Sequence, residues 1–261
     1  MTLPDLHTLW IKGSLSNLEQ ICLASMLTQG HKVTLHTYGK VENIPKGVNV
    51  CNAQETLAYD DNYRHAKTRS ISLLADYFRC VLLKREMGVW VDLDCYLLQP
   101  LEVPSHGYLL GHEINTINSA VLHLPSDSPV LNDLLDACKS SNTSPYWLDY
   151  RRRFLKRVAY AICGKSWHLG EMGWGIVGPV ALTRLIPKYN LLDKVQPMKA
   201  FYPVDRHGSS KLFEAEPYDQ ILSDSDIKSI HIYDKRKKYE TPIPGSFIQW
   251  ATMQMQAYLK Q

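Results

Sequence analysis

The stretch that decides the fold is Gly88-Val89-Trp90-Val91-Asp92-Leu93-Asp94. Side chains alternate along a strand, so the two valines face one way while Asp92 and Asp94 face the other. A helix is expected just before it, over residues 67–87, because the apolar side chains there fall on one stripe. Gly88 gives that helix a natural end. The sequence therefore predicts a helix followed at once by a strand that ends in two aspartates.

The region before this stretch predicts a βαβ unit. Residues 6–11 are short and apolar, as in a strand, and residues 15–28 show helical spacing. Residues 32–38 alternate like a second strand. Two strands joined through a helix favour a parallel sheet covered by helices, and so an α/β protein. Further strands are expected at 107–110, 120–124 and 229–233, and further helices at 129–138, 146–163, 179–186 and 247–259.

Composition narrows the possible functions. With 261 residues, 45% of them hydrophobic, the chain can bury a large core in one domain. The formal charge of +3 is too mild for a nucleic-acid-binding protein. The six cysteines form no C-x-x-C pair, which argues against a zinc site, and most of them lie in apolar segments, which favours reduced, buried thiols. No signal peptide or membrane-spanning run is visible, so we expect a cytoplasmic protein with at most peripheral contact at the inner face of a membrane.

The aspartate pair predicts a metal site. Two carboxylates held together at a strand end repel each other, and a divalent cation relieves that repulsion. Carboxylate oxygens favour Mn²⁺ or Mg²⁺. A cation bound by Asp92 and Asp94 would hold a diphosphate at the carboxyl end of the strand, where open α/β sheets bind ligands. The competing interpretation is a pair of solvated aspartates in a turn.

A second candidate pair lies on the preceding helix. Asp76 and Arg79 are three residues apart and share a helix face away from the apolar stripe. The aspartate could accept hydrogen bonds from sugar hydroxyls, and the arginine could hold a phosphate with its planar fork. The alternative is an ordinary surface ion pair, which would contribute little to stability.

Residues 75–79 and 88–94 together resemble the D-x-x-R…G-G-x-Y-x-D-x-D signature of glycosyltransferase family 32. That group is related to α-1,4-galactosyltransferases, initiating mannosyltransferases and the catalytic domains of clostridial glucosylating toxins. Met87 stands where the first glycine is usual, and Trp90 stands where tyrosine is frequent. The resemblance implies a GT-A fold, which is a Rossmann-like domain with a mixed central sheet flanked by helices. A single such domain would cover residues 1–261, with a donor-binding half over about 1–125 and acceptor-side helices and a C-terminal metal segment over about 126–261.

The same resemblance implies roles for four more residues. Trp10 would stack on the base of the donor, and Asn118 would touch the transferred sugar. Gly178 lies in a stretch similar to the family's W-x-x-G-P segment and would belong to a glycine loop over the donor. His231 would join the two aspartates as the third protein ligand of the metal.

The resemblance further implies a retaining, metal-dependent transferase. It would move a hexose or N-acetylhexosamine from a UDP-sugar, or alternatively from GDP-mannose, to a hydroxyl of a glycan or lipid-linked glycan. The expected setting is bacterial surface polysaccharide synthesis, such as lipopolysaccharide or capsule. Two alternatives stay open, a toxin-like transferase that glycosylates a protein and an inactive module that binds a nucleotide sugar.

Three other signals have weaker interpretations. The pattern Gly173-x-Gly175-x-x-Gly178 matches a dinucleotide fingerprint but follows no clear strand, so NAD binding is not expected. The run Arg151–Arg157 is basic with apolar neighbours, which suits either contact with anionic lipid or a solvated helix face. A lysine within 235–238 could reach the diphosphate.

Overall fold

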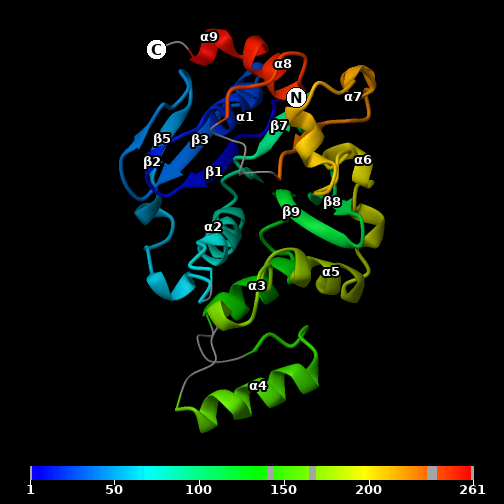
Figure 1. The fold of residues 1–261 in the computed structure, drawn as a ribbon. Coiled ribbons are helices and arrows are strands. Elements are labelled where there is room, and N and C mark those ends of the chain that lie inside the picture. The colour runs from blue at the N-terminus through cyan, green and yellow to red at the C-terminus, as the bar shows by residue number, and fades with distance from the viewer. Residues whose placement is uncertain (1, 67, 140–143, 165–168, 234–239, 260–261) are drawn as a thin grey trace.

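The computed structural model describes residues 2–66, 68–139, 144–164, 169–233 and 240–259. Within them lies a six-stranded mixed sheet flanked by helices, so the predicted α/β class is confirmed (Figure 1). Its strands, in spatial order, are β5 (Asn49–Asn52), β3 (Val33–Thr37), β1 (Leu6–Trp10), β6 (Val89–Val91), β9 (Thr116–His123) and β8 (Leu109–Glu113). Two small sheets pair β10 (Ser229–His231) with β7 (Cys95–Leu97), and β2 (Gly13–Ser14) with β4 (Val41–Glu42).

The order of the parallel strands creates a crevice beside β1. From β1 the chain adds β3 and then β5 on one side, and it crosses back to place β6 on the other side. The strands β9 and β8 then continue the sheet in antiparallel pairs. Such a reversal of strand order opens a crevice at the carboxyl ends of the two central strands, where α/β proteins bind ligands.

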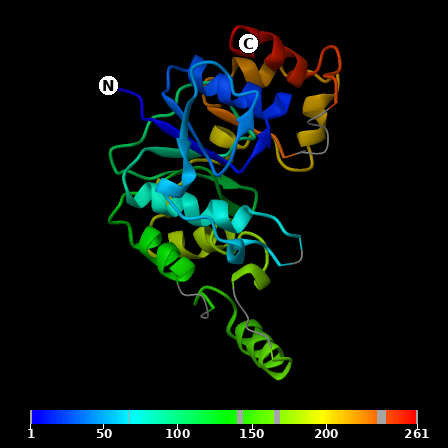
Figure 2. The ribbon, with the colours of Figure 1, turned by 90° about the vertical axis from the view of Figure 1, so that its left-hand side faces the viewer.

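Helices cover both faces of the sheet, as Figure 2 shows. One layer contains α1, α8 and α9, and the opposite layer contains α2, α3 and α5 (Figure 2). The helices are α1 (Asn17–Thr28), α2 (Ser72–Lys84), α3 (Pro129–Lys139), α4 (Tyr150–Ile162), α5 (Pro179–Lys188), α6 (Met198–Phe201), α7 (Asp219–Ser223), α8 (Phe247–Gln254) and α9 (Gln256–Leu259). Short 3₁₀ segments lie at Ala53–Glu55, Asp61–Tyr63, Leu169–Glu171, Leu192–Lys194 and Ser209–Phe213. No helix among the described residues is long and apolar enough to cross a membrane.

The helix before the acidic stretch is shorter than predicted. It spans Ser72–Lys84 instead of residues 67–87, and Arg69 just before it has a positive φ of 56° that a helix cannot contain. The helix ends at Lys84 and not at Gly88 as predicted, and Glu86 already takes a positive φ of 55°. Gly88 follows with a φ of 141°. A side chain at this position would collide with the backbone carbonyl oxygen of Asp5. Glycine is therefore needed for the sharp entry into β6.

The strand after the helix is also shorter than predicted. It ends at Val91, and residues 92–94 form a turn in which the backbone N–H of Cys95 donates to the carbonyl oxygen of Asp92 at 3.0 Å. The alternation expected through Asp94 is therefore wrong, because the chain turns to begin β7. The two aspartates lie in the connection between two strands and do not share one strand face.

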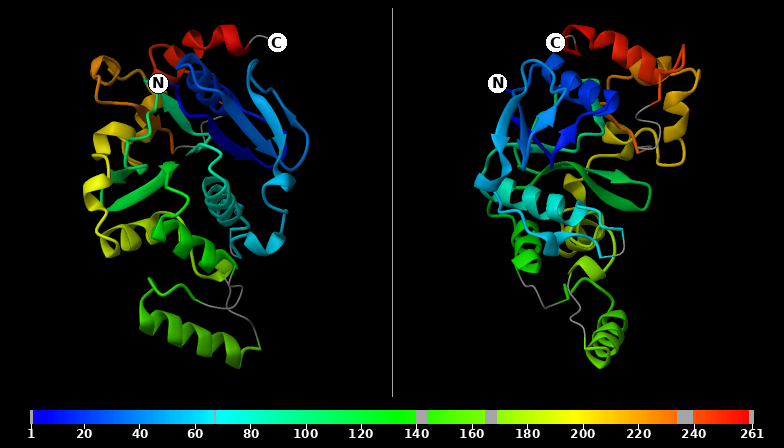
Figure 3. Two further views of the ribbon diagram at one scale, coloured as in Figure 1. Left: turned by 180° about the vertical axis from the view of Figure 1, so that it is seen from behind. Right: turned by 60° about the vertical axis from the view of Figure 1, so that its left-hand side comes forward.

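One helix, α4, extends away from the rest of the molecule (Figures 1 and 3). It is predicted over residues 146–163 and observed over Tyr150–Ile162. Large apolar side chains on it are exposed, including Leu155 and Ile162 at 65% and 81%. The hydroxyl of Tyr160 donates to a carboxylate oxygen of Glu171 at 2.9 Å, which ties the helix to the following segment.

The cysteines only partly fit the prediction of buried thiols. Four are buried, at positions 22, 80, 95 and 138, and all six are free. Cys51 and Cys163 are exposed. Burial raises the pKa of the Cys22, Cys80 and Cys138 thiols, so they remain protonated in the core.

Candidate active site

A cleft of about 830 Å³ opens at the carboxyl ends of β1 and β6. This volume suits a ligand of nucleotide-sugar size. Trp10 at the end of β1 and the turn after β6 form one part of its wall. Helix α2 contributes a second part, and the segments before α5 and after α6 contribute a third. The cleft is therefore assembled at the crevice that the strand order creates.

Helix α2 and the acidic turn form a buried charge network. A terminal nitrogen of Arg79, Nη2, lies 2.9 Å from Asp76 Oδ1 and 3.7 Å from Asp92 Oδ1. The other terminal nitrogen donates to the backbone carbonyl oxygen of Ser119 on β9. The indole Nε1 of Trp90 donates to Asp92 Oδ1 at 2.6 Å. The network links α2, the turn after β6 and β9.

The ion pair on α2 differs from the surface pair considered as an alternative. Asp76 and Arg79 are each only 5% exposed, and both line the cleft. Burial raises the pKa of the Asp76 carboxyl to about 6, which outweighs the opposite effect of Arg79, and nearby Asp92 raises it further. Near neutral pH a large share of the Asp76 carboxyl is ionised, so it can accept hydrogen bonds from hydroxyl groups.

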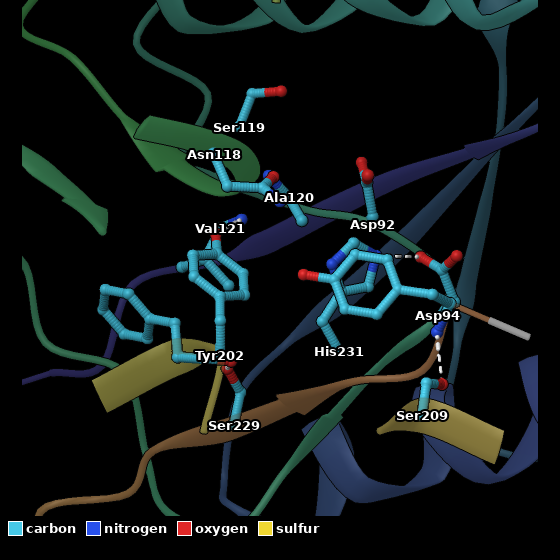
Figure 4. A network of polar contacts seen from close by, with 12 residues as sticks. Asp92, Asp94, Asn118, Ser119, Ala120, Val121, Tyr202, Ser209, Ser229 and His231 are labelled. Atoms are coloured by element: carbon cyan, nitrogen blue, oxygen red, sulfur yellow. Dashed lines mark hydrogen bonds and ion pairs between the residues drawn. The ribbon is translucent and has the colours of Figure 1, made fainter. Parts of the chain in front are cut away.

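The second aspartate of the turn has a different partner. Asp94 Oδ1 lies 3.2 Å from His231 Nε2, and both residues are buried (Figure 4). His231 reaches this position because β10 pairs with β7, and the backbone N–H of Ile232 donates to the Asp94 carbonyl oxygen at 2.7 Å. Figure 4 shows the Asp92 side chain pointing away from this pair. Two segments 137 residues apart in sequence therefore meet at the cleft.

Asp94, Cys95 and His231 lie close enough to hold one metal ion, because one ligand atom from each lies within 4.8 Å of the other two. The Nε2 atom of His231 faces Asp94 Oδ1 across 3.2 Å, so a single ion could contact both atoms. The carboxylate oxygen of Asp94 suits Mn²⁺ or Mg²⁺, whereas the imidazole nitrogen of His231 is a ligand more typical of transition metals. The Cys95 thiol packs within an apolar cluster, so we assign it to the core. Asp94 and His231 thus fit a metal, whereas the ligand role of Asp92 stays a prediction.

Asn118 is fixed by the hairpin between β8 and β9. Its side-chain amide donates to a carboxylate oxygen of Glu113 at 2.6 Å, and its side-chain oxygen accepts from the backbone N–H of Ala120 at 2.8 Å. The residue is 5% exposed and lines the cleft. Both ends of the amide therefore have protein partners, and the predicted contact with a sugar stays a prediction.

Gly178 lies against the carboxylate of Asp76. A Cβ atom at position 178 would come within 2.9 Å of Asp76 Oδ1, which is closer than real Cβ atoms approach. The next residue, Pro179, opens α5 and lines the cleft. Glycine thus allows the start of α5 to pack against the buried charge network. Its predicted contact with a donor stays a prediction.

The sequence reasoning did not single out Arg206 or Tyr233 as functional, although both line the cleft. Tyr233 packs against His231 with ring centroids 3.9 Å apart and ring planes tilted by 46°. Arg206 comes from a loop between α6 and the 3₁₀ segment Ser209–Phe213, and no motif in the sequence marks it. Only the three-dimensional packing reveals it. The predicted lysine within 235–238 falls outside the described residues.

No protein-family model matches the sequence, and no curated protein matches it either. Among the solved structures similar to the chain is one titled "PaToxG Glycosyltransferase", at 16% identity and a TM-score of 0.43. The similarity covers 73% of this chain and 74% of that one. So loose a superposition assigns no function, and the chemistry is argued from the residues of the cleft.

Proposed function

We propose that this protein is a metal-dependent, retaining glycosyltransferase that uses a UDP-sugar. The observation that carries the proposal is the placement of the acidic turn. Asp92 and Asp94 lie in the crevice beside β1, in a cleft that also contains His231 and the Asp76–Arg79 pair. Carboxylates, an imidazole and a guanidinium around one space match the parts of a nucleotide diphosphate sugar.

The donor would lie across the carboxyl ends of β1 and β6. Trp10 is half-buried at the end of β1 and lines the cleft, so its ring can stack on uracil. Asp76 would accept hydrogen bonds from sugar hydroxyls, and Arg79 would hold Asp76 in position. GDP-mannose is the alternative donor, since stacking on an aromatic ring tolerates any base.

Asp94 and His231 would hold a divalent cation beside the diphosphate. When bound, such a cation neutralises the charge that grows on the leaving nucleoside diphosphate. The bond from the anomeric carbon to the phosphate oxygen breaks, and the acceptor oxygen forms a bond to the same carbon from the same face. The acceptor proton passes to the departing phosphate oxygen. No described side chain needs to act as a nucleophile.

The acceptor is proposed to be a hydroxyl of a glycan or lipid-linked glycan in surface polysaccharide synthesis. A transferase that modifies a protein is the second candidate. An inactive nucleotide-sugar-binding module is the third. Incubation with lipid-linked glycan and with protein acceptors separates the first two, and absence of turnover despite nucleotide binding would favour the third.

Release of UDP from a panel of UDP-sugars tests the proposal. We expect turnover with Mn²⁺. Trp10→Ala removes the stacking surface and should lower the turnover rate at least about a hundredfold. Stacking contributes roughly 1–3 kcal/mol per base, and misplacement of the sugar adds to that loss. Trp250→Ala, on α8 and outside the residues that line the cleft, is the matched control. Full turnover by Trp10→Ala would contradict the proposed donor position.

We also propose that α4 rests on an anionic membrane surface. Residues 151–157 carry five basic residues, and Phe154, Leu155 and Val158 are exposed at 55%, 65% and 42%. The side chains of Arg152, Arg153 and Lys156 lie outside the described residues, while those of Arg151 and Arg157 are exposed. A basic helix with uncovered apolar side chains suits the boundary between lipid headgroups and acyl chains.

A further inference from the structure

The mouth of the cleft contains a cluster that the proposed donor does not use. The guanidinium carbon of Arg206 lies 5.4 Å from the ring centroid of Trp174 and 5.6 Å from that of Tyr233. Both distances suit cation–π contacts. Tyr233 in turn packs against His231. These side chains form a continuous row from the candidate metal ligand to the surface.

Among the residues that the structure describes, none forms a hydrogen bond or ion pair with the Arg206 side chain. Across the part of the chain that the structure describes, no carboxylate forms an ion pair with it, whereas Arg79 in the same cleft has two. Arg206 lies in a turn that the backbone N–H of Gly208 closes by donating to Asp205 Oδ1 at 2.6 Å. A guanidinium held between two rings presents its N–H groups edge-on, in a planar fork that fits a phosphate or a carboxylate.

Trp174 adds an apolar surface beside this fork. Its side chain is 56% exposed although it lines the cleft. A large exposed ring at the mouth of a cleft marks a binding surface, and the C–H face of a sugar ring is a suitable partner for it. A sugar stacked on Trp174 would bring its substituents within reach of Arg206.

We propose that Trp174 and Arg206 form the acceptor subsite, and that it takes a sugar bearing a phosphate or a carboxylate. The acceptor subsite rests on the proposed function in one respect, which is that a nucleotide-sugar donor occupies the inner cleft. The inner groups, Asp76, Arg79 and the Asp94–His231 pair, suffice for the donor. The cluster lies farther out, one aromatic ring beyond His231, where an attacking sugar would enter.

The test uses three sugars without any nucleotide, so that it does not depend on turnover. Methyl glucoside, methyl glucuronide and glucose 6-phosphate are titrated into the full chain, and binding is followed by saturation-transfer NMR. We expect at least one anionic sugar to bind about tenfold more tightly than the neutral one, as a charge-assisted hydrogen bond implies. Arg206→Gln should abolish that preference, and Trp174→Ala should weaken all three. Arg184→Gln, an exposed arginine on α5, should change nothing.

The outcomes separate the two proposals. A preference for only the phosphate or only the carboxylate identifies the anionic group of the acceptor. Equal binding of the three sugars, no binding, or an unchanged preference in Arg206→Gln would overturn the acceptor subsite. It would also be overturned if Arg206→Gln weakened UDP binding and left the anionic sugars unaffected. Failure of the donor proposal shows separately, as absence of metal-dependent UDP binding. Melting temperatures of the variants exclude unfolding as the cause.

Discussion

Helices α2 and α4 are both 13 residues long and both carry arginine, yet their arginines lie in opposite surroundings. On α2, Arg79 is 5% exposed and contacts two carboxylates. On α4, Arg151 and Arg157 are exposed, and apolar side chains beside them are uncovered. Helix α2 is packed between the sheet and α3, whereas α4 extends away from the body (Figure 3).

The comparison shows that placement decides what an arginine does. A buried guanidinium stabilises the chain only through its carboxylate partners, and the loss of either partner leaves an uncompensated charge. An exposed guanidinium contributes little to stability and remains free to bind something else. Helix α2 therefore belongs to the wall of the cleft, whereas the exposed arginines of α4 are the groups that we propose contact an anionic membrane.

The largest expected difference is in stability. Arg79→Gln leaves Asp76 and Asp92 close together without their cation, so the free energy of unfolding should fall by about 3–5 kcal/mol. Arg157→Gln on α4 removes the same charge and should change the free energy of unfolding by less than about 0.5 kcal/mol. Urea unfolding of both variants at pH 7 measures this. Similar losses in the two variants would contradict the comparison.

A second prediction concerns pH and the buried carboxyl of α2. Burial raises the pKa of Asp76 from 3.8 to about 6. Between these values the folded chain keeps a proton that the unfolded chain has released, so this group's contribution to stability is lost as pH rises. Relative to Asp76→Asn, the wild type should lose about 3 kcal/mol of unfolding free energy between pH 3 and pH 7.

Urea unfolding of both proteins at several pH values, without added metal, measures the difference between their free energies of unfolding. The contributions of the titratable groups that the two proteins share cancel in this difference. If the wild type instead gained stability over Asp76→Asn as pH rises, the attraction of Arg79 would outweigh burial. The charge network would then be an ordinary ion pair.

The smallest expected effect concerns α4 and membranes. Each basic residue near an anionic surface contributes about 1 kcal/mol, so Arg151→Gln with Arg157→Gln should weaken binding to phosphatidylserine vesicles roughly thirtyfold. The control is Arg184→Gln with Lys211→Gln, which removes the same charge elsewhere. Co-sedimentation with vesicles measures both pairs. Equal weakening by the control would show that only net charge matters, and absence of binding by the wild type would refute the membrane contact.

The sequence predicts the α/β class and the helix–strand junction around Gly88 because both depend on local patterns. It does not predict the turn at Asp92–Asp94, since that turn is completed by β7 pairing with β10 far along the chain. The Trp174–Arg206 contact lacks any sequence signal for the same reason. The basic, amphipathic pattern of α4 is visible in the sequence, but its extension away from the body is not.

The central claim is that Asp94 and His231 hold a divalent cation beside a nucleotide diphosphate. Titration of Mn²⁺ followed by electron paramagnetic resonance tests it most directly, with and without UDP. We expect the wild type to bind one Mn²⁺ more tightly when UDP is present, and Asp94→Asn and His231→Gln to lose most of that binding while keeping their melting temperatures. Undiminished Mn²⁺ binding in both folded variants, or no effect of UDP on the wild type, would contradict the account.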